Sequence, residues 1–161
     1  MSLPVHHFDT KEVGLDFKRN VYNLFPDDMF FPMKEPMHED VKKYMRDEDP
    51  DIMFETMGTG DQFWVDCTYL SSFDNNGNLK LYSPDEAEKR SHYYGSLEDP
   101  VFLAVGVGGT TSDPFTFMFG HVSRFNLKKM DSVECNRLST YFGYDVVYDA
   151  IEKYFEEKRD H

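Results

Sequence analysis

The sequence contains, at residues 63–70, the run Phe-Trp-Val-Asp-Cys-Thr-Tyr-Leu. Phe63, Val65, Cys67 and Tyr69 alternate in it with a second set of side chains that includes Asp66. A period of two predicts a β-strand, because successive side chains of a strand point to opposite faces of a sheet. We therefore expect a strand that is buried on one face and partly covered on the other.

Two turn signals predict that this strand belongs to an antiparallel sheet. The segment 74–78 reads Asp-Asn-Asn-Gly-Asn, and Asn-Gly accepts the positive φ of a tight turn, so residues 79–82 are expected to return as a second strand. A second hairpin is predicted from residues 101–107, the glycines at 108 and 109, and a returning strand over 115–122. Two hairpins give a mostly antiparallel sheet of about four strands.

Helical spacing precedes this sheet in the chain. Apolar residues recur at intervals of three and four between Asp9 and Phe25, and Pro26 ends the pattern. A second helix is predicted after Pro36, and residues 51–57 are expected to add a short helical turn. Between the hairpins, residues 83–94 begin with Ser-Pro-Asp-Glu, which is typical of a helix start and predicts a short surface helix or loop.

The chain returns to helical spacing after the second hairpin. Asp131 and Glu134 form the pattern of a capping box, and a final helix has its apolar face at Val146, Val147, Ala150, Ile151, Tyr154 and Phe155. Helices at both ends of a central antiparallel sheet are typical of an α+β domain. The sequence therefore predicts one α+β domain over residues 1–161.

Charge and aromatic content together limit the class of protein. The formal net charge is -13, yet the chain contains 15 Phe, 10 Tyr and one Trp, so it has the apolar surface that a disordered acidic chain lacks. An acidic surface repels phosphate groups, so no direct contact with nucleic acid or membrane is expected. Since the start of the chain lacks a signal-peptide pattern, we predict a cytoplasmic protein, or one in the host cytoplasm if it is virus-encoded.

No motif predicts a metal or a cofactor. The glycines of residues 106–111 lack the lysine and the following helix of a phosphate-binding loop, and the acidic runs near residues 47 and 74 lack the glycine of a calcium loop. Cys67 and Cys135 lie far apart without CxxC spacing, which favours free thiols. No catalytic residue is predicted on these grounds.

Charge and apolar side chains meet most closely in residues 27–55. This segment holds ten acidic and four basic residues, so it carries a net charge of -6, and it encloses the apolar run Met29-Phe30-Phe31-Pro32-Met33. An apolar centre with a charged rim is a common design of protein interfaces, although the same run could also pack inward. The predicted interface consists of Asp27, Asp28, Phe30, Phe31, Glu35, Glu39, Asp40, Asp47, Glu48 and Asp49.

Composition alone predicts a non-catalytic acidic protein that docks on a basic surface of another protein. One form of this hypothesis is a nucleic-acid mimic, of a viral anti-defence or immunity type, that inhibits a nucleic-acid-binding enzyme. Two alternatives remain open: an assembly subunit that packs through Phe30 and Phe31, and a small enzyme in which Cys67 and His121 meet across the sheet. The sequence leaves the oligomeric state open.

Overall fold

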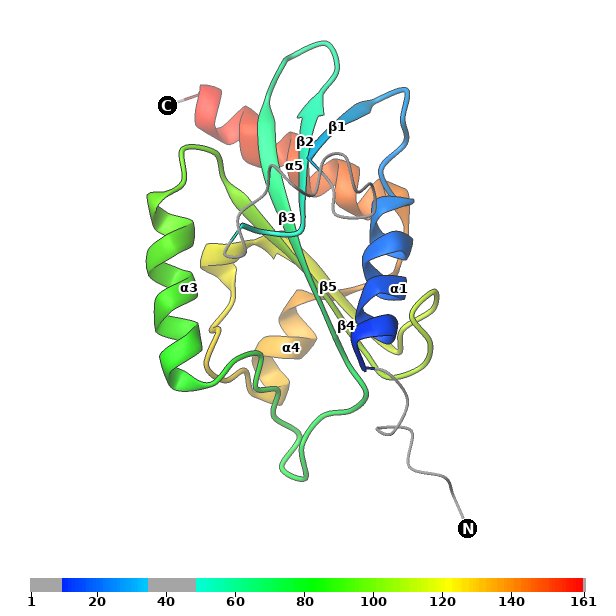
Figure 1. The fold of residues 1–161 in the computed structure, drawn as a ribbon, viewed down its shortest axis with the longest axis vertical. Helices are drawn as coiled ribbons and strands as arrows, with labels where there is room; N and C mark the ends of the chain where they lie inside the picture. Colours follow the sequence, from blue (N-terminus) through cyan, green and yellow to red (C-terminus); the bar gives the residue numbers. More distant parts are fainter. Residues whose placement is uncertain (1–9, 35–48, 161) are drawn as a thin grey trace.

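The computed structural model describes residues 10–34 and 49–160. In it, the chain forms a six-stranded sheet with helices on both faces (Figure 1). The described part is one mixed α+β domain with four α-helices, so the predicted class is confirmed, whereas the predicted four strands are corrected to six. The elements are α1 (Thr10–Tyr22), β1 (Phe30–Lys34), β2 (Ile52–Thr56), β3 (Gln62–Leu70), α3 (Pro84–Ser96), β4 (Val101–Val107), β5 (Thr116–His121), the 3-10 helix η2 (Val122–Arg124), α4 (Ser132–Leu138), β6 (Ser139–Thr140) and α5 (Tyr144–Arg159).

The strands lie in chain order from β1 to β6, and every neighbouring pair is antiparallel except β3 and β4. The parallel pair runs from Trp64 opposite Val101 to Leu70 opposite Val107. Helix α3 is the crossover between these two strands, as parallel neighbours require. All seven residues of β4 are buried, which explains its uninterrupted apolar sequence.

The predicted hairpin of β4 and β5 is confirmed. The strands pair antiparallel from Phe102 opposite His121 to Val107 opposite Thr116. The turn needs glycine at position 109, where φ is +62° and an added Cβ would lie 2.5 Å from the carbonyl oxygen of Asp113.

The predicted hairpin after β3 is wrong, although its turn exists. Asp74 accepts hydrogen bonds from the backbone N–H groups of Asn76 and Asn78, and Gly77 has a φ of +75°. The following segment does not pair with β3; instead Leu79 forms an isolated bridge with Met130. Leu79 and Leu81 are buried in the core on the α3 side of the sheet, so their burial determines the path of the chain here.

Two segments before β3 also differ from the predictions. Residues 52–56 form β2 and not a helical turn, because Ile52, Met53 and Phe54 are all buried between the neighbouring strands β1 and β3. The apolar run around Phe30 forms β1 at the edge of the sheet. The helix predicted after Pro36 lies outside the described residues.

Each face of the sheet has its own apolar core. On one face, α1 and α5 cover an aromatic cluster that includes Phe17, Phe63 and Phe102. On the other face, α3, α4 and residues 79–82 cover a cluster that includes Trp64 and Leu103. Alternating residues of β3 and β4 contribute to opposite clusters, as the pleat of a strand dictates.

The helices end close to the predicted positions. Helix α1 lies within the predicted range of 9–25, and α5 matches the predicted final helix, with Val147 and Ile151 buried. Helix α3 begins after Ser83, whose side chain accepts a hydrogen bond from the backbone of Glu86. Within residues 10–34 and 49–160, no helix is both long enough and apolar enough to cross a membrane.

Helix α4 begins with a capping box formed by Asp131 and Glu134. Asp131 accepts a hydrogen bond from the Glu134 backbone N–H at 2.8 Å, and the Glu134 side chain accepts one from the Asp131 N–H at 3.3 Å. Asp131→Ala is expected to lower the free energy of unfolding by about 1 kcal/mol, because it leaves a helix N–H without its partner. Urea denaturation measures the change. Asp131→Ser, which keeps an acceptor, should recover most of it; equal losses in both variants would contradict the assignment.

Candidate functional site

The structure separates the predicted interface residues. Asp27 and Asp28 are exposed in the turn before β1. Phe31 is 57% exposed, whereas Phe30 is only 1% exposed and packs against Phe25 and other rings of the aromatic cluster. Phe30 is therefore corrected from an interface residue to a core residue, because side chains in β1 alternate between the two sides of the strand.

The other predicted interface residues add no continuous surface. Asp49 is half-buried and accepts a hydrogen bond from the Tyr93 hydroxyl at 2.5 Å. The remaining five lie outside the described residues: Glu35, Glu39, Asp40, Asp47 and Glu48.

The alternative site of Cys67 and His121 does not form. Cys67 on β3 is paired with Ala104 on β4, and Ala104 is paired with Phe119 on β5. His121 therefore lies two strands away from Cys67 and two residues beyond the position level with it. Two strand spacings alone are about 10 Å. Burial raises the pKa of the Cys67 thiol well above its ordinary value, and the carboxylates of Asp51 and Asp66 raise it further. The thiol is thus protonated and not a nucleophile at neutral pH.

His121 instead has a structural role with a measurable pH dependence. Its ring stacks on Tyr154 of α5, and burial, followed by the nearby Lys158 ammonium, lowers its pKa. Since the pKa is lower in the folded than in the unfolded chain, the unfolded chain takes up the proton first as the pH falls through about 6.5, and stability decreases.

We expect His121→Gln to lose less free energy of unfolding between pH 7.5 and 5.5 than the wild type. His92→Gln, at an exposed position, should behave as the wild type; equal pH dependence of all three proteins would contradict the prediction.

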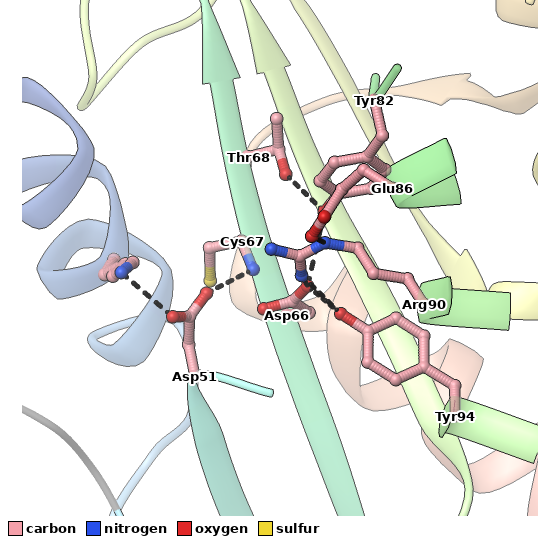
Figure 2. Close-up of polar contacts among 9 residues, drawn as sticks. Asp51, Asp66, Cys67, Thr68, Tyr82, Glu86, Arg90 and Tyr94 are labelled. Carbon is pink, nitrogen blue, oxygen red and sulfur yellow. Dashed lines mark hydrogen bonds and ion pairs between the residues drawn. The ribbon is translucent and has the colours of Figure 1, made fainter. Parts of the chain in front are cut away.

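A buried carboxylate, Asp66, marks a different site (Figure 2). Its Oδ2 accepts hydrogen bonds from the hydroxyls of Tyr94 and Tyr82, the latter at 3.3 Å, and Arg90 Nη1 lies 3.3 Å away. Asp66 is the only buried charged residue in the described ranges 10–34 and 49–160. A buried charge is costly unless it is paired and hydrogen-bonded, and these donors meet that requirement.

A second carboxylate, Asp51, lies beside the same strand. Its Oδ2 accepts the backbone N–H of Cys67 at 2.8 Å, and its Oδ1 lies 2.9 Å from the Nζ of Lys18 on α1. The pairing of β2 with β3 ends at Ile52 opposite Val65, so Asp51 takes the place of a strand partner for the Cys67 N–H. The side chains of Lys18 and Asp51 are 31% and 15% exposed, which leaves this side of the site accessible to water.

The sheet brings the two carboxylates together. Asp51 directly precedes Ile52 and Asp66 directly follows Val65, and these two are opposed in the antiparallel register. Burial raises the pKa of Asp66 well above its ordinary value; the charge of Asp51, which lies within hydrogen-bonding reach, raises it further, against the opposing effects of Tyr94 and Arg90. Repulsion between two neighbouring acids is offset by nearby cations, here Lys18 and Arg90, by a shared proton or by a bound metal ion.

Two basic side chains approach this pair from opposite faces of the sheet. Burial lowers the pKa of Lys18, but the Asp51 carboxylate outweighs that effect, so the pKa is raised and the ammonium stays charged. Arg90 on α3 also donates to Glu86 Oε1 at 2.9 Å. We refer to Asp51, Asp66 and Lys18 as the carboxylate site. It contains two carboxyl groups and one ammonium group.

The carboxylate site can hold a divalent cation of the Mg²⁺ type. Mg²⁺ is commonly bound by one or two carboxylates together with water and substrate phosphates. Among the described residues, no group of three or more His, Cys, Asp or Glu side chains could hold a metal ion. A cation held by two carboxylates would take its other ligands from water and substrate.

Only one signal in the sequence could have identified this site. Asp66 is a charged residue in an otherwise largely apolar strand, and such residues are rarely buried without a partner. Asp51 had no local signal, because its importance depends on the register between β2 and β3. Lys18 appeared as one charge among several on α1.

Comparisons with known proteins were made by sequence and by structure. No family model matches the sequence, and no curated protein matches it. Among the solved structures of similar shape is that of Archaeoglobus fulgidus Hjc, a Holliday junction resolvase from an archaeal hyperthermophile. It is 15% identical to this chain, with a TM-score of 0.49, and the alignment covers 80% of this chain and 90% of the resolvase.

The printed description of this structure differs from the function predicted from composition. The solved structure is that of a Holliday junction resolvase, whereas the prediction was a non-catalytic acidic inhibitor without direct nucleic-acid contact. The predicted docking on a basic protein surface, the description as a viral nucleic-acid mimic and the exclusion of nucleic acid conflict with that description and are corrected. The physical reason is that net charge is a sum over the whole surface and does not report the charges of one site. The assembly alternative is corrected on its own ground, because Phe30, one of its two residues, is buried in the core.

Proposed function

We propose that this chain is a nucleic-acid-processing enzyme that hydrolyses phosphodiester bonds with a divalent cation at the carboxylate site. The observation that carries the proposal is the register of β2 and β3, which sets two carboxylates side by side, one of them buried, beside a lysine that is ion-paired with the other. Two acids and a lysine are the groups needed to bind a cation and a phosphate side by side.

Asp51 and Asp66 would hold the cation. Both carboxylates are kept in place by donors of the fold, namely the Cys67 N–H for Asp51 and the Tyr94 hydroxyl for Asp66. A bound Mg²⁺ or Mn²⁺ would polarise a phosphoryl oxygen and lower the pKa of an attached water.

Lys18 would contact the phosphate itself. Its ammonium lies at the more exposed side of the site, and it can turn from Asp51 to a non-bridging phosphate oxygen without leaving the charged form. There it would stabilise the negative charge that develops during hydrolysis. The overall charge of -13 opposes a polyanion, so we expect substrate binding to be weak without divalent cations.

The test is cleavage of end-labelled single-stranded DNA, duplex DNA and RNA in the presence of Mg²⁺, Mn²⁺ or EDTA. We expect cleavage of at least one substrate with Mg²⁺ or Mn²⁺ and none with EDTA. An Asp51→Asn protein purified in parallel controls for contaminating nucleases. Failure to cleave any of the substrates with either cation would overturn the proposal. Cleavage that persists in EDTA would instead indicate that the two acids work through a shared proton.

A further inference from the structure

On the α3 side of the carboxylate site, the side chains that donate hydrogen bonds to Asp66 all contact the same carboxylate oxygen, Oδ2. Tyr94 and Arg90 on α3 and Tyr82 just before that helix all approach Oδ2 (Figure 2). Among the described residues, these three side chains donate no hydrogen bond to Oδ1 of Asp66. The orientation of the carboxylate is therefore fixed from the α3 side, through Oδ2 alone.

Arg90 is itself held in one position by three further contacts. Its Nε donates to Glu86 Oε1 at 2.9 Å, its Nη1 donates to the Tyr94 hydroxyl at 2.9 Å, and its Cζ lies 4.3 Å from the centre of the Tyr82 ring. Glu86, Arg90 and Tyr94 are spaced by four residues, so they share one face of α3. A planar guanidinium can make these contacts at once, whereas a lysine ammonium cannot.

The charge of Arg90 also acts on the acid. The guanidinium and the Tyr94 hydroxyl are the two groups that favour the charged form of Asp66 against burial and the neighbouring Asp51. Burial lowers the pKa of Arg90, but the surrounding tyrosines and Asp66 raise it more, so Arg90 remains positive. Loss of Arg90 would leave Asp66 freer to turn, because both Arg90 and the Tyr94 hydroxyl that it contacts hold Oδ2.

We propose that Arg90 is a positioning residue of this enzyme: it orients Asp66 for cation binding without touching the substrate. The proposal rests on the function proposed above. Groups that orient metal ligands typically contribute 10–100-fold to metal affinity or activity. Arg90→Ala is therefore expected to lower kcat and the affinity for Mn²⁺ by roughly 10–100-fold, with the KM for nucleic acid changed by less than about threefold.

The experiment compares wild type, Arg90→Ala, Arg90→Lys and Lys89→Ala by cleavage kinetics and by calorimetric Mn²⁺ titration. Lys89 is the matched control, because it is an exposed cation on the neighbouring position of α3. Added guanidinium should restore part of the activity of Arg90→Ala and leave the other proteins unchanged. Arg90→Lys should remain impaired, since it keeps the charge without the planar fork.

Each outcome decides between the two proposals. Wild-type activity and Mn²⁺ affinity in Arg90→Ala would overturn the role of Arg90 and leave the proposed function standing. A wild-type protein that neither cleaves nucleic acid nor binds Mn²⁺ would overturn both. If Arg90→Ala does not fold, Tyr94→Phe removes only the hydroxyl that bridges Arg90 and Asp66, and it should weaken Mn²⁺ binding in the same direction; unchanged binding would overturn the positioning role.

Discussion

Replacement of Asp51 by asparagine is expected to lower the rate of phosphodiester hydrolysis by about 10³-fold. The substitution removes one of two anionic cation ligands and the partner of Lys18. Charge stabilisation by a bound metal is worth several kcal/mol, and about 4 kcal/mol corresponds to this change in rate. The measurement is the single-turnover cleavage rate at a Mn²⁺ concentration that saturates the wild type.

The fold should survive this substitution. The amide oxygen of asparagine can still accept the Cys67 N–H, and Lys18 is exposed enough to reach water. Asp61→Asn is a matched control, because Asp61 also carries an ion pair, with Arg159 at 2.8 Å, on another part of the surface. A rate of Asp51→Asn within threefold of wild type, or an equal loss in Asp61→Asn, would contradict the assignment.

Phe63→Ala is expected to destabilise the protein by about 3–5 kcal/mol, the largest effect that we predict on stability. Phe63 is completely buried, and its ring lies within 6.3 Å of the rings of Phe25, Phe30, Phe54, Phe102 and Phe155. The substitution leaves a cavity in the middle of this cluster, which rigid neighbouring rings cannot fill.

Urea denaturation followed by circular dichroism measures this loss. Phe115→Ala serves as the control, because Phe115 is 88% exposed and its removal should change the free energy of unfolding by less than about 0.5 kcal/mol. A loss below about 1 kcal/mol in Phe63→Ala would contradict the described core.

Sequence patterns predicted the structure correctly where residues close together in the chain determine it. The capping box at Asp131, the end of α1 before Pro26 and the hairpin of β4 and β5 each depend on residues close together in the chain. In contrast, the order of the strands depends on which helix packs on which face. The turn at Gly77 is formed as predicted, yet burial of Leu79 beside Met130 leads the chain away from β3.

The carboxylate site could not be predicted for a related reason. Its two acids are 15 positions apart in the sequence, and only the register of Ile52 with Val65 makes them neighbours. Composition drew attention to the acidic segment around Phe30, where acids are most numerous. Asp51 and Asp66 are distinguished by the burial of Asp66 and by their neighbouring positions in the sheet, and neither property is visible in the number of charges.

The most direct test of the carboxylate site is a calorimetric titration of Mn²⁺ into the wild type and into Asp51→Asn, Asp66→Asn and Asp61→Asn at pH 7. The proposed site predicts Mn²⁺ binding by the wild type and by Asp61→Asn, and loss of binding in both Asp51→Asn and Asp66→Asn, because the two carboxylates act on one cation. Folded Asp51→Asn and Asp66→Asn proteins that bind Mn²⁺ as tightly as the wild type would contradict it.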